Sequence, residues 1–402
     1  MINSASRTVS ALAVASLLLT ACSGSVGEGA APPAKHPVFS LPLGEQPYQT
    51  VRETQQAGSA AFHQVLTFTS KQGDAVLTTA GRLDFSGGRA DGTHTWKIPN
   101  GFPATTKEFL LGATLGEGSA AASARIALTP ESVLHRSGKG DYWLRYDLDE
   151  PIDEVDSISW LHGSESPFGG TLLEVISALH SINGQPVAGG GRRFTAHIVP
   201  SGATGSLLPS DLRRRMQVVV PAESAGTPVP LILTTDAKGL ITQAEADLSA
   251  LLKEGDSGLP DVTALRARLV LTGHGRTKPA LPPVSDAVLD AGKAVQPRYA
   301  AAAGDCVDFT TGTRRAALVV KVPCTGPHDA RIYAQVTLKG AYTGEKGAKR
   351  RATDACGSAY HSARPAWTSD SVDPDEYMSV WPTEEHGDSP PKQVVTCFVL
   401  SR

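Results

Sequence analysis

Apolar and polar residues alternate along much of the chain between residues 59 and 275. In the stretch 61–85 this alternation runs on both sides of the polar segment Lys71–Asp74, which predicts two paired strands joined by a turn. Asp236–Gly239 is a second turn of this kind. Further strand-like stretches cover 90–98, 125–137, 141–149, 192–200, 216–221, 230–248 and 264–275. The pattern predicts a large antiparallel sheet.

Two segments show helical periodicity instead. The stretch 48–62 is helix-like, and a second helix is predicted over 168–182. In the second, Leu172, Leu173, Ile176 and Leu179 would lie on one apolar face.

The first 21 residues have the pattern of a secretory signal peptide: one Arg, no acidic residue, and a short apolar run that ends in small residues. The stretch Leu19-Thr20-Ala21-Cys22 that follows resembles the lipobox of bacterial lipoproteins. This resemblance implies cleavage before Cys22 and acyl chains, such as palmitate, on that residue. We expect a lipid anchor at the extracytoplasmic face of the cell membrane; the alternative is a free Cys after an ordinary signal peptide.

Composition divides the remaining chain into two blocks. Residues 22–47 are rich in Gly, Pro, Ala and Ser and predict a flexible tether. A Pro/Ala-rich linker is expected over 277–301, between a cysteine-free domain at 48–276 and a four-cysteine domain at 302–402. The formal net charge of the 402 residues is −3, which does not indicate nucleic-acid binding.

The first domain resembles the LppX/LprG family of actinobacterial lipoproteins, which share a LolA-like half-barrel. The resemblance rests on the lipobox, the consecutive hairpins, the strand 140–148, the Leu-rich helix and the late hairpin around Asp236 and Gly239. It implies an α+β fold in which helices cover a curved antiparallel half-barrel and enclose an apolar cavity for lipid or glycolipid chains. The insertion 109–124 departs from the family pattern.

Alternation places apolar side chains in pairs on single faces of the first three predicted strands. These candidates for lining the cavity are Leu66, Phe68, Leu83, Phe85, Trp96 and Ile98. The structural interpretation is that they only fill a protein core, which is the usual role of an apolar strand face.

The four remaining cysteines, an even number, allow three disulfide pairings in an oxidising compartment. Residues 302–400 resemble the septum-formation-like domain of exported actinobacterial proteins through Gly304-Asp305-Cys306, Cys324, Pro327-His328-Asp329, Cys356 and Cys397, although Arg331 stands where that family usually has Glu. Sequence order and strand layout favour the pairs Cys306–Cys324 and Cys356–Cys397 in a small α+β domain. The rival is a zinc site, which the absence of a C-x₂-C pair disfavours.

Motifs for catalysis are not apparent, so we expect no enzyme, no cofactor and no metal. His328 and Asp329 form either a binding pair or a turn before a strand. The acidic runs 147–156 and 370–376 could hold Ca²⁺ or be solvated loops.

The sequence therefore predicts a membrane-anchored lipoprotein that binds or transfers a lipid or a lipid-linked molecule. The alternative is a non-enzymatic protein of the cell envelope that binds an envelope or septum partner through its C-terminal domain.

Overall fold

The structure is a computed structural model, and it describes residues 36–111, 123–137, 141–147, 179–198, 228–252, 259–282, 287–308, 318–338, 345–369, 378–380 and 394–401. The signal segment, Cys22 and most of the expected tether lie outside these ranges. No helix among them is long and apolar enough to cross a membrane.

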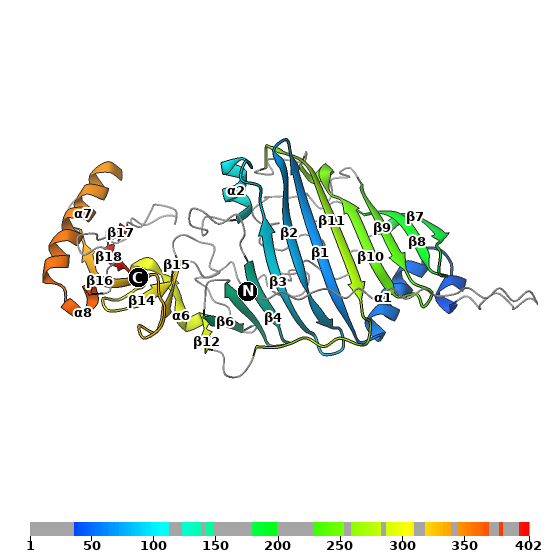
Figure 1. The fold of residues 1–402 in the computed structure, drawn as a ribbon, viewed down its shortest axis with the longest axis horizontal. Coiled ribbons are helices and arrows are strands. Elements are labelled where there is room, and N and C mark those ends of the chain that lie inside the picture. The colour runs from blue at the N-terminus through cyan, green and yellow to red at the C-terminus, as the bar shows by residue number, and fades with distance from the viewer. Residues whose placement is uncertain are drawn as a thin grey trace, which may run out of the picture. The chain divides into compact units, whose positions relative to one another are not determined.

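A twelve-stranded sheet dominates the first part of the chain (Figure 1). Its strand order is β12-β6-β5-β4-β3-β2-β1-β11-β10-β9-β8-β7, and every pair is antiparallel except β12 with β6. The bounds are β1 Ser59–Ser70, β2 Gly73–Asp84, β3 Arg89–Lys97, β4 Ser123–Leu128, β5 Ser132–Ser137, β6 Tyr142–Asp147, β7 Leu179–Pro186, β8 Arg192–Ile198, β9 Val229–Thr235, β10 Ile241–Asp247, β11 Val262–Thr272 and β12 Ala287–Asp290.

The sheet confirms the predicted hairpins and is open at β12 and β7, since each of these strands has one neighbour among the described strands. Its central pair is not local, because β1 pairs with β11 about 200 residues later in the sequence. Short helices accompany the sheet: η1 Pro37–Ser40, α1 Gln46–Gln56, α2 Ala104–Leu111 and η4 Ser249–Leu252. Val38 and Phe39 of η1 are buried, so the packed part of the chain begins before residue 48.

Both helix predictions are wrong at their C-terminal ends. The first extends to residue 62, but α1 ends at Gln56 and residues 59–62 belong to β1. The periodicity predicts a helix through Ile182, but Leu179 is the first residue of β7. The strand begins there because Leu179 pairs with Ile198 of β8, and tertiary pairing overrides local propensity. Leu172, Leu173 and Ile176 lie outside the described residues.

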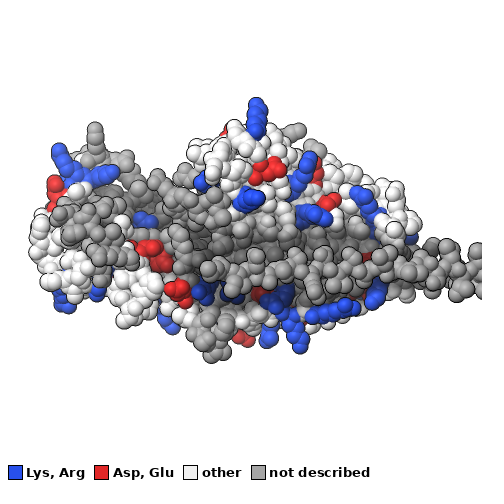
Figure 2. Space-filling model, in the orientation of Figure 1, with Lys and Arg blue, Asp and Glu red and all other residues white. Residues whose placement is uncertain are grey.

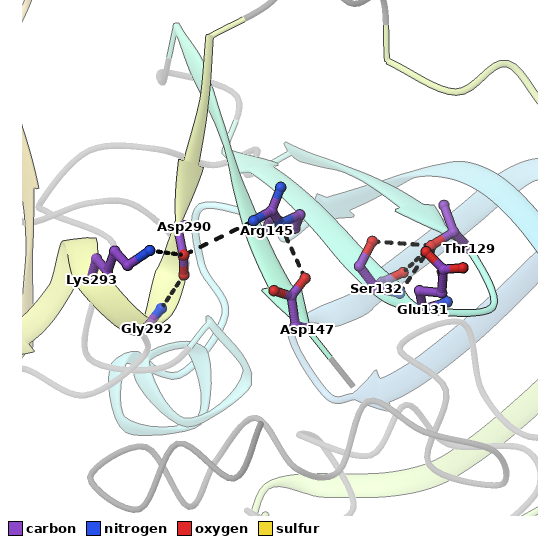
Figure 3. Close-up of polar contacts among 8 residues, drawn as sticks. All are labelled: Thr129, Glu131, Ser132, Arg145, Asp147, Asp290, Gly292 and Lys293. Atoms are coloured by element: carbon purple, nitrogen blue, oxygen red, sulfur yellow. Dashed lines mark hydrogen bonds and ion pairs between the residues drawn. The ribbon is translucent and has the colours of Figure 1, made fainter. Parts of the chain in front are cut away.

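The segment expected as a linker contains ordered elements. β12 pairs in parallel with β6 and is followed at once by α6 Ala291–Ala294, β13 Val295–Pro297 and η5 Arg298–Ala300. Asp290 ends β12 and caps α6 by accepting a hydrogen bond from the Gly292 amide at 3.1 Å; it also pairs with Lys293 at 3.2 Å and with Arg145 of β6 at 3.9 Å (Figure 3). These exposed ion pairs are each worth at most about 1 kcal/mol, so backbone pairing holds β12 in place.

The C-terminal part is a six-stranded antiparallel sheet with the order β13-β15-β14-β16-β18-β17. Its further elements are β14 Cys306–Asp308, β15 Leu318–Val322, β16 Ala330–Thr337, α7 Glu345–Ser362, α8 Pro365–Thr368, β17 Met378–Val380 and β18 Val394–Leu400. Tyr142 of β6 donates a hydrogen bond to the carboxylate of Asp308 in β14 at 2.9 Å.

Two disulfides join Cys306 with Cys324 and Cys356 with Cys397, which are the pairs that strand layout favoured. The second ties α7 to β18, where Cys356 and Cys397 are fully buried in one apolar cluster. The first links β14 to the residues after β15, and Cys324 is exposed.

Removing either disulfide should destabilise the C-terminal part, and the second should cost more. The loops closed span 18 and 41 residues, so the chain-entropy model gives about 3 kcal/mol for Cys306→Ala/Cys324→Ala and about 4 kcal/mol for Cys356→Ala/Cys397→Ala. Urea unfolding followed by Trp fluorescence measures both. The reverse order would contradict this account.

Gly81 should not tolerate a side chain. A Cβ there would lie 1.8 Å from the backbone oxygen of Asp91 in β3, and a backbone atom cannot move aside as a side chain can. We expect Gly81→Ala to lower the free energy of unfolding by about 1–3 kcal/mol. The matched control is Gly101→Ala, where a Cβ meets nothing within 4 Å; the prediction fails if both variants have the same urea midpoint.

Candidate functional site

One face of the large sheet, which we call the inner face, carries the candidate site. Register defines it: Leu66 of β1 lies opposite Leu77 of β2, and Leu77 lies opposite Trp96 of β3. In the other direction Leu66 lies opposite Ala267 of β11, and the row continues through β10, β9 and β8 with Ala246, Leu231 and Ala196. All seven side chains are buried. A continuous apolar row therefore crosses seven strands.

The inner face mixes large and very small side chains. Buried alanines of this face occur on six strands, and Gly81 of β2 lies opposite Gly92 of β3 on the same face. The buried inner-face alanines are Ala60, Ala75, Ala90, Ala196, Ala244, Ala246 and Ala267. Alanine and glycine extend less far from the sheet than the neighbouring Leu and Trp side chains. The space above them can therefore be filled by a hydrocarbon chain or by another part of the protein.

A short polar row interrupts the apolar face. Gln64, Thr79 and His94 are cross-strand neighbours on β1, β2 and β3, and each is at most 9% exposed. The Thr79 hydroxyl lies 3.4 Å from Nδ1 of His94. Buried polar groups cost free energy unless they form hydrogen bonds, so this row marks a place where polar chemistry is held inside an apolar layer.

Two apolar clusters lie on either side of the polar row. The first, near the β1–β2 turn, contains four of the six predicted cavity residues: Leu66, Phe68, Trp96 and Ile98. The rings of Phe68 and Trp96 are 5.7 Å apart. The other two, Leu83 and Phe85, are half-buried and pack against the second cluster, near the opposite end of β2. The six residues thus share one face but form two groups, and their lining of a cavity stays a prediction.

Sequence reasoning missed the polar row and the contributions of other elements to the first cluster. Phe102 and Leu110 near and in α2, and Leu251 in η4, also belong to it. Only the register of β1, β2 and β3 shows that Gln64, Thr79 and His94 are neighbours. Alternation alone could have indicated that each is a polar residue at an apolar position of its strand.

Burial also affects one hydroxyl on this face. Tyr146 of β6 is 4% exposed, and desolvation raises the pKa of its phenol. The hydroxyl is therefore neutral throughout the physiological range and can only exchange hydrogen bonds.

The other candidates from the sequence have structural surroundings. Nδ1 of His328 lies 2.9 Å from the Gly326 carbonyl, and the Asp329 amide bonds to Val307, which agrees with a turn before β16. Of the acidic runs, only Asp147 is described, and it pairs with Arg145 at 3.1 Å. In the described ranges no three His, Cys, Asp or Glu side chains gather as metal ligands. On the described part of the surface that Figure 2 draws, acidic and basic side chains are interspersed.

No family model and no curated protein matches the sequence. Solved structures that resemble the fold in part include the following three. The lipoprotein LppX of Mycobacterium tuberculosis is 10% identical, with 58% of this chain and 96% of that chain covered and a TM-score of 0.30. LprF of Mycobacterium bovis is 10% identical, with 60% and 97% covered and a TM-score of 0.32. An outer membrane lipoprotein-sorting protein domain from Vibrio parahaemolyticus is 9% identical, with 56% and 92% covered and a TM-score of 0.19. Likenesses at these TM-scores carry no argument about function.

Truncating inner-face leucines should separate the two groups of predicted cavity residues. Leu66 is 1% exposed and central in its row, so Leu66→Ala should lower the free energy of unfolding by about 2–5 kcal/mol. Leu83→Ala should cost clearly less, because Leu83 is half-buried. Urea unfolding of both variants decides this, and equal costs would contradict the difference in burial between Leu66 and Leu83.

Proposed function

We propose that the protein is a membrane-anchored, non-enzymatic lipoprotein that binds a lipid or a lipid-linked molecule on the inner face of its large sheet. The supporting observation is the continuous apolar row from Trp96 to Ala196, in which alanines lie beside large side chains. Apolar surfaces with a few placed polar groups are typical of small-molecule sites.

The mechanism that we propose is noncovalent capture. Acyl chains leave water and pack against the alanine-containing part of the inner face, which releases about 0.8 kcal/mol for each buried CH₂ group. The polar row of Gln64, Thr79 and His94 lies within the same face and would meet an ester or hydroxyl group of the ligand. The expected lipid anchor at Cys22 would keep the carrier at its membrane.

The second candidate function is binding of an envelope or septum partner through the C-terminal part. The observation that favours it is the exposure of two apolar side chains there, Tyr299 at 57% and Leu400 at 37%. Single exposed apolar residues are common on protein surfaces, so this candidate has the weaker support.

A substitution of one inner-face alanine tests the lipid proposal. Ala246→Phe places a large ring between Leu231 and Ala267, and we expect it to reduce binding of a fluorescent fatty acid and of copurified lipid at least tenfold. Ala264→Phe is the matched control, because Ala264 lies on the opposite face of the sheet on β11 and should leave binding unchanged.

The same two variants also show which result would refute lipid binding. If the inner face is already filled by protein, Ala246→Phe will overpack it and lower the free energy of unfolding by about 1–3 kcal/mol. Wild-type protein would then carry no lipid, by native mass spectrometry of the full chain in detergent. That pair of results would refute lipid binding and leave partner binding as the proposal.

A further inference from the structure

The edge of the large sheet that is furthest from β12 carries two histidines opposite each other. This edge is formed by β7, which lies beside β8 (Figure 1). His180 of β7 pairs with His197 of β8. Both side chains are exposed, and their ring centroids are 6.0 Å apart with planes inclined by 36°. The two imidazoles therefore stand side by side in solvent, on the face of the sheet opposite the inner face.

The backbone beside His180 has an unusual conformation. The register of β7 on β8 shifts between His180 and Asn183, which is a β-bulge. Within it, Ser181 has a φ of 53°, and it is the one non-glycine with positive φ among the described residues. Bulges redirect side chains, and strained backbone of this kind gathers at functional sites. A bulge also protects an edge strand from pairing with other chains, but that role does not require histidines.

The distance between the rings fits one shared metal ion. Metal–nitrogen bonds to imidazole are about 2.0–2.1 Å long, so two rings on one ion have centroids at most roughly 6.4 Å apart. The observed 6.0 Å lies within that limit, and rotation of the side chains toward each other would bring the centroids to the roughly 5 Å that a tetrahedral ion requires. Neutral imidazole suits Zn²⁺, Ni²⁺ and Cu²⁺, and Cu²⁺ binds most strongly to a given set of such ligands.

The neighbouring positions do not oppose a cation. Asn183 and Thr195 follow along the same face, and Pro230 of β9 lies opposite His197. The nearest charged residue described on that face of β8 is Arg193, two positions beyond Thr195. Asn183 supplies an amide oxygen near the pair, and water can complete the ligand set.

We propose that His180 and His197 chelate one divalent transition-metal ion, with Cu²⁺ bound more tightly than Zn²⁺. This site is independent of lipid binding, because it lies on the opposite face of the sheet. Metal ions bind the neutral form of imidazole, so protons compete with the ion for the ring nitrogens and affinity should fall in acid.

Calorimetric titration of the full chain in detergent with CuCl₂ and with ZnCl₂ at pH 7.5 tests the proposal. We expect the wild-type chain to bind one ion. In His180→Ala and in His197→Ala the affinity for this ion should fall at least tenfold. The double variant should lose no more than either single variant, because both residues hold the same ion. His63→Ala is the matched control: His63 is exposed on the same face of β1 and has Ala80 and Val270 opposite it, so affinity should not change.

Signals of the imidazole groups in NMR spectra give a second readout that does not depend on total binding. The ring signals of His180 and His197 should shift over the same range of Zn²⁺ concentration. His180→Gln should abolish the shift at His197. Titrations that are unchanged in either single variant would overturn the proposal. Losses that add in the double variant would overturn it as well, because they indicate two separate one-ligand contacts.

Discussion

The register of the central strands is the constraint on which the rest of the large sheet depends. Side chains on a strand alternate between faces, so a slip of one residue would move Leu66 and Phe68 from the inner face to solvent. The β1–β2 register is unbroken over twelve paired residues, and β1 continues on its other side into β11. Burial of the inner face on seven strands penalises every alternative register, and both the apolar row and the polar row follow from this alignment.

Two local departures from regular strand geometry also affect the surface of the sheet. At Gly81 the strands approach so closely that the Asp91 carbonyl occupies the place of a Cβ, and the glycine pair with Gly92 leaves the inner face without side chains at that point. At Ser181 a bulge with positive φ interrupts the pairing of the edge strand β7 with β8, directly after His180. The glycine pair lies beside the polar row of the inner face, and the bulge lies beside the histidine pair. Each irregularity thus borders one of the two proposed sites.

The sequence predicted the local features of the fold well. Alternation identified the hairpins around Lys71 and Asp236, and strand layout favoured the two cysteine pairs that the structure contains. It did not predict β12, since four residues in a Pro/Ala-rich segment carry little periodicity and their parallel pairing with β6 depends on contacts distant in sequence. The end of the helix predicted over 168–182 was wrong at Leu179 for the same reason. For the candidate site, six apolar residues could be named, but their division by Gln64, Thr79 and His94 required the register.

The two parts of the chain differ in how they are stabilised. Two disulfides join strands and a helix of the C-terminal part covalently. The described part of the large sheet contains no cysteine, and burial of its apolar face must supply its stability. A ligand that binds only the folded sheet adds RT ln(1 + [L]/Kd) to that stability. A lipid carrier held at a membrane would meet its ligand at high local concentration, so the loaded sheet would be the stable form and the empty sheet the marginal one.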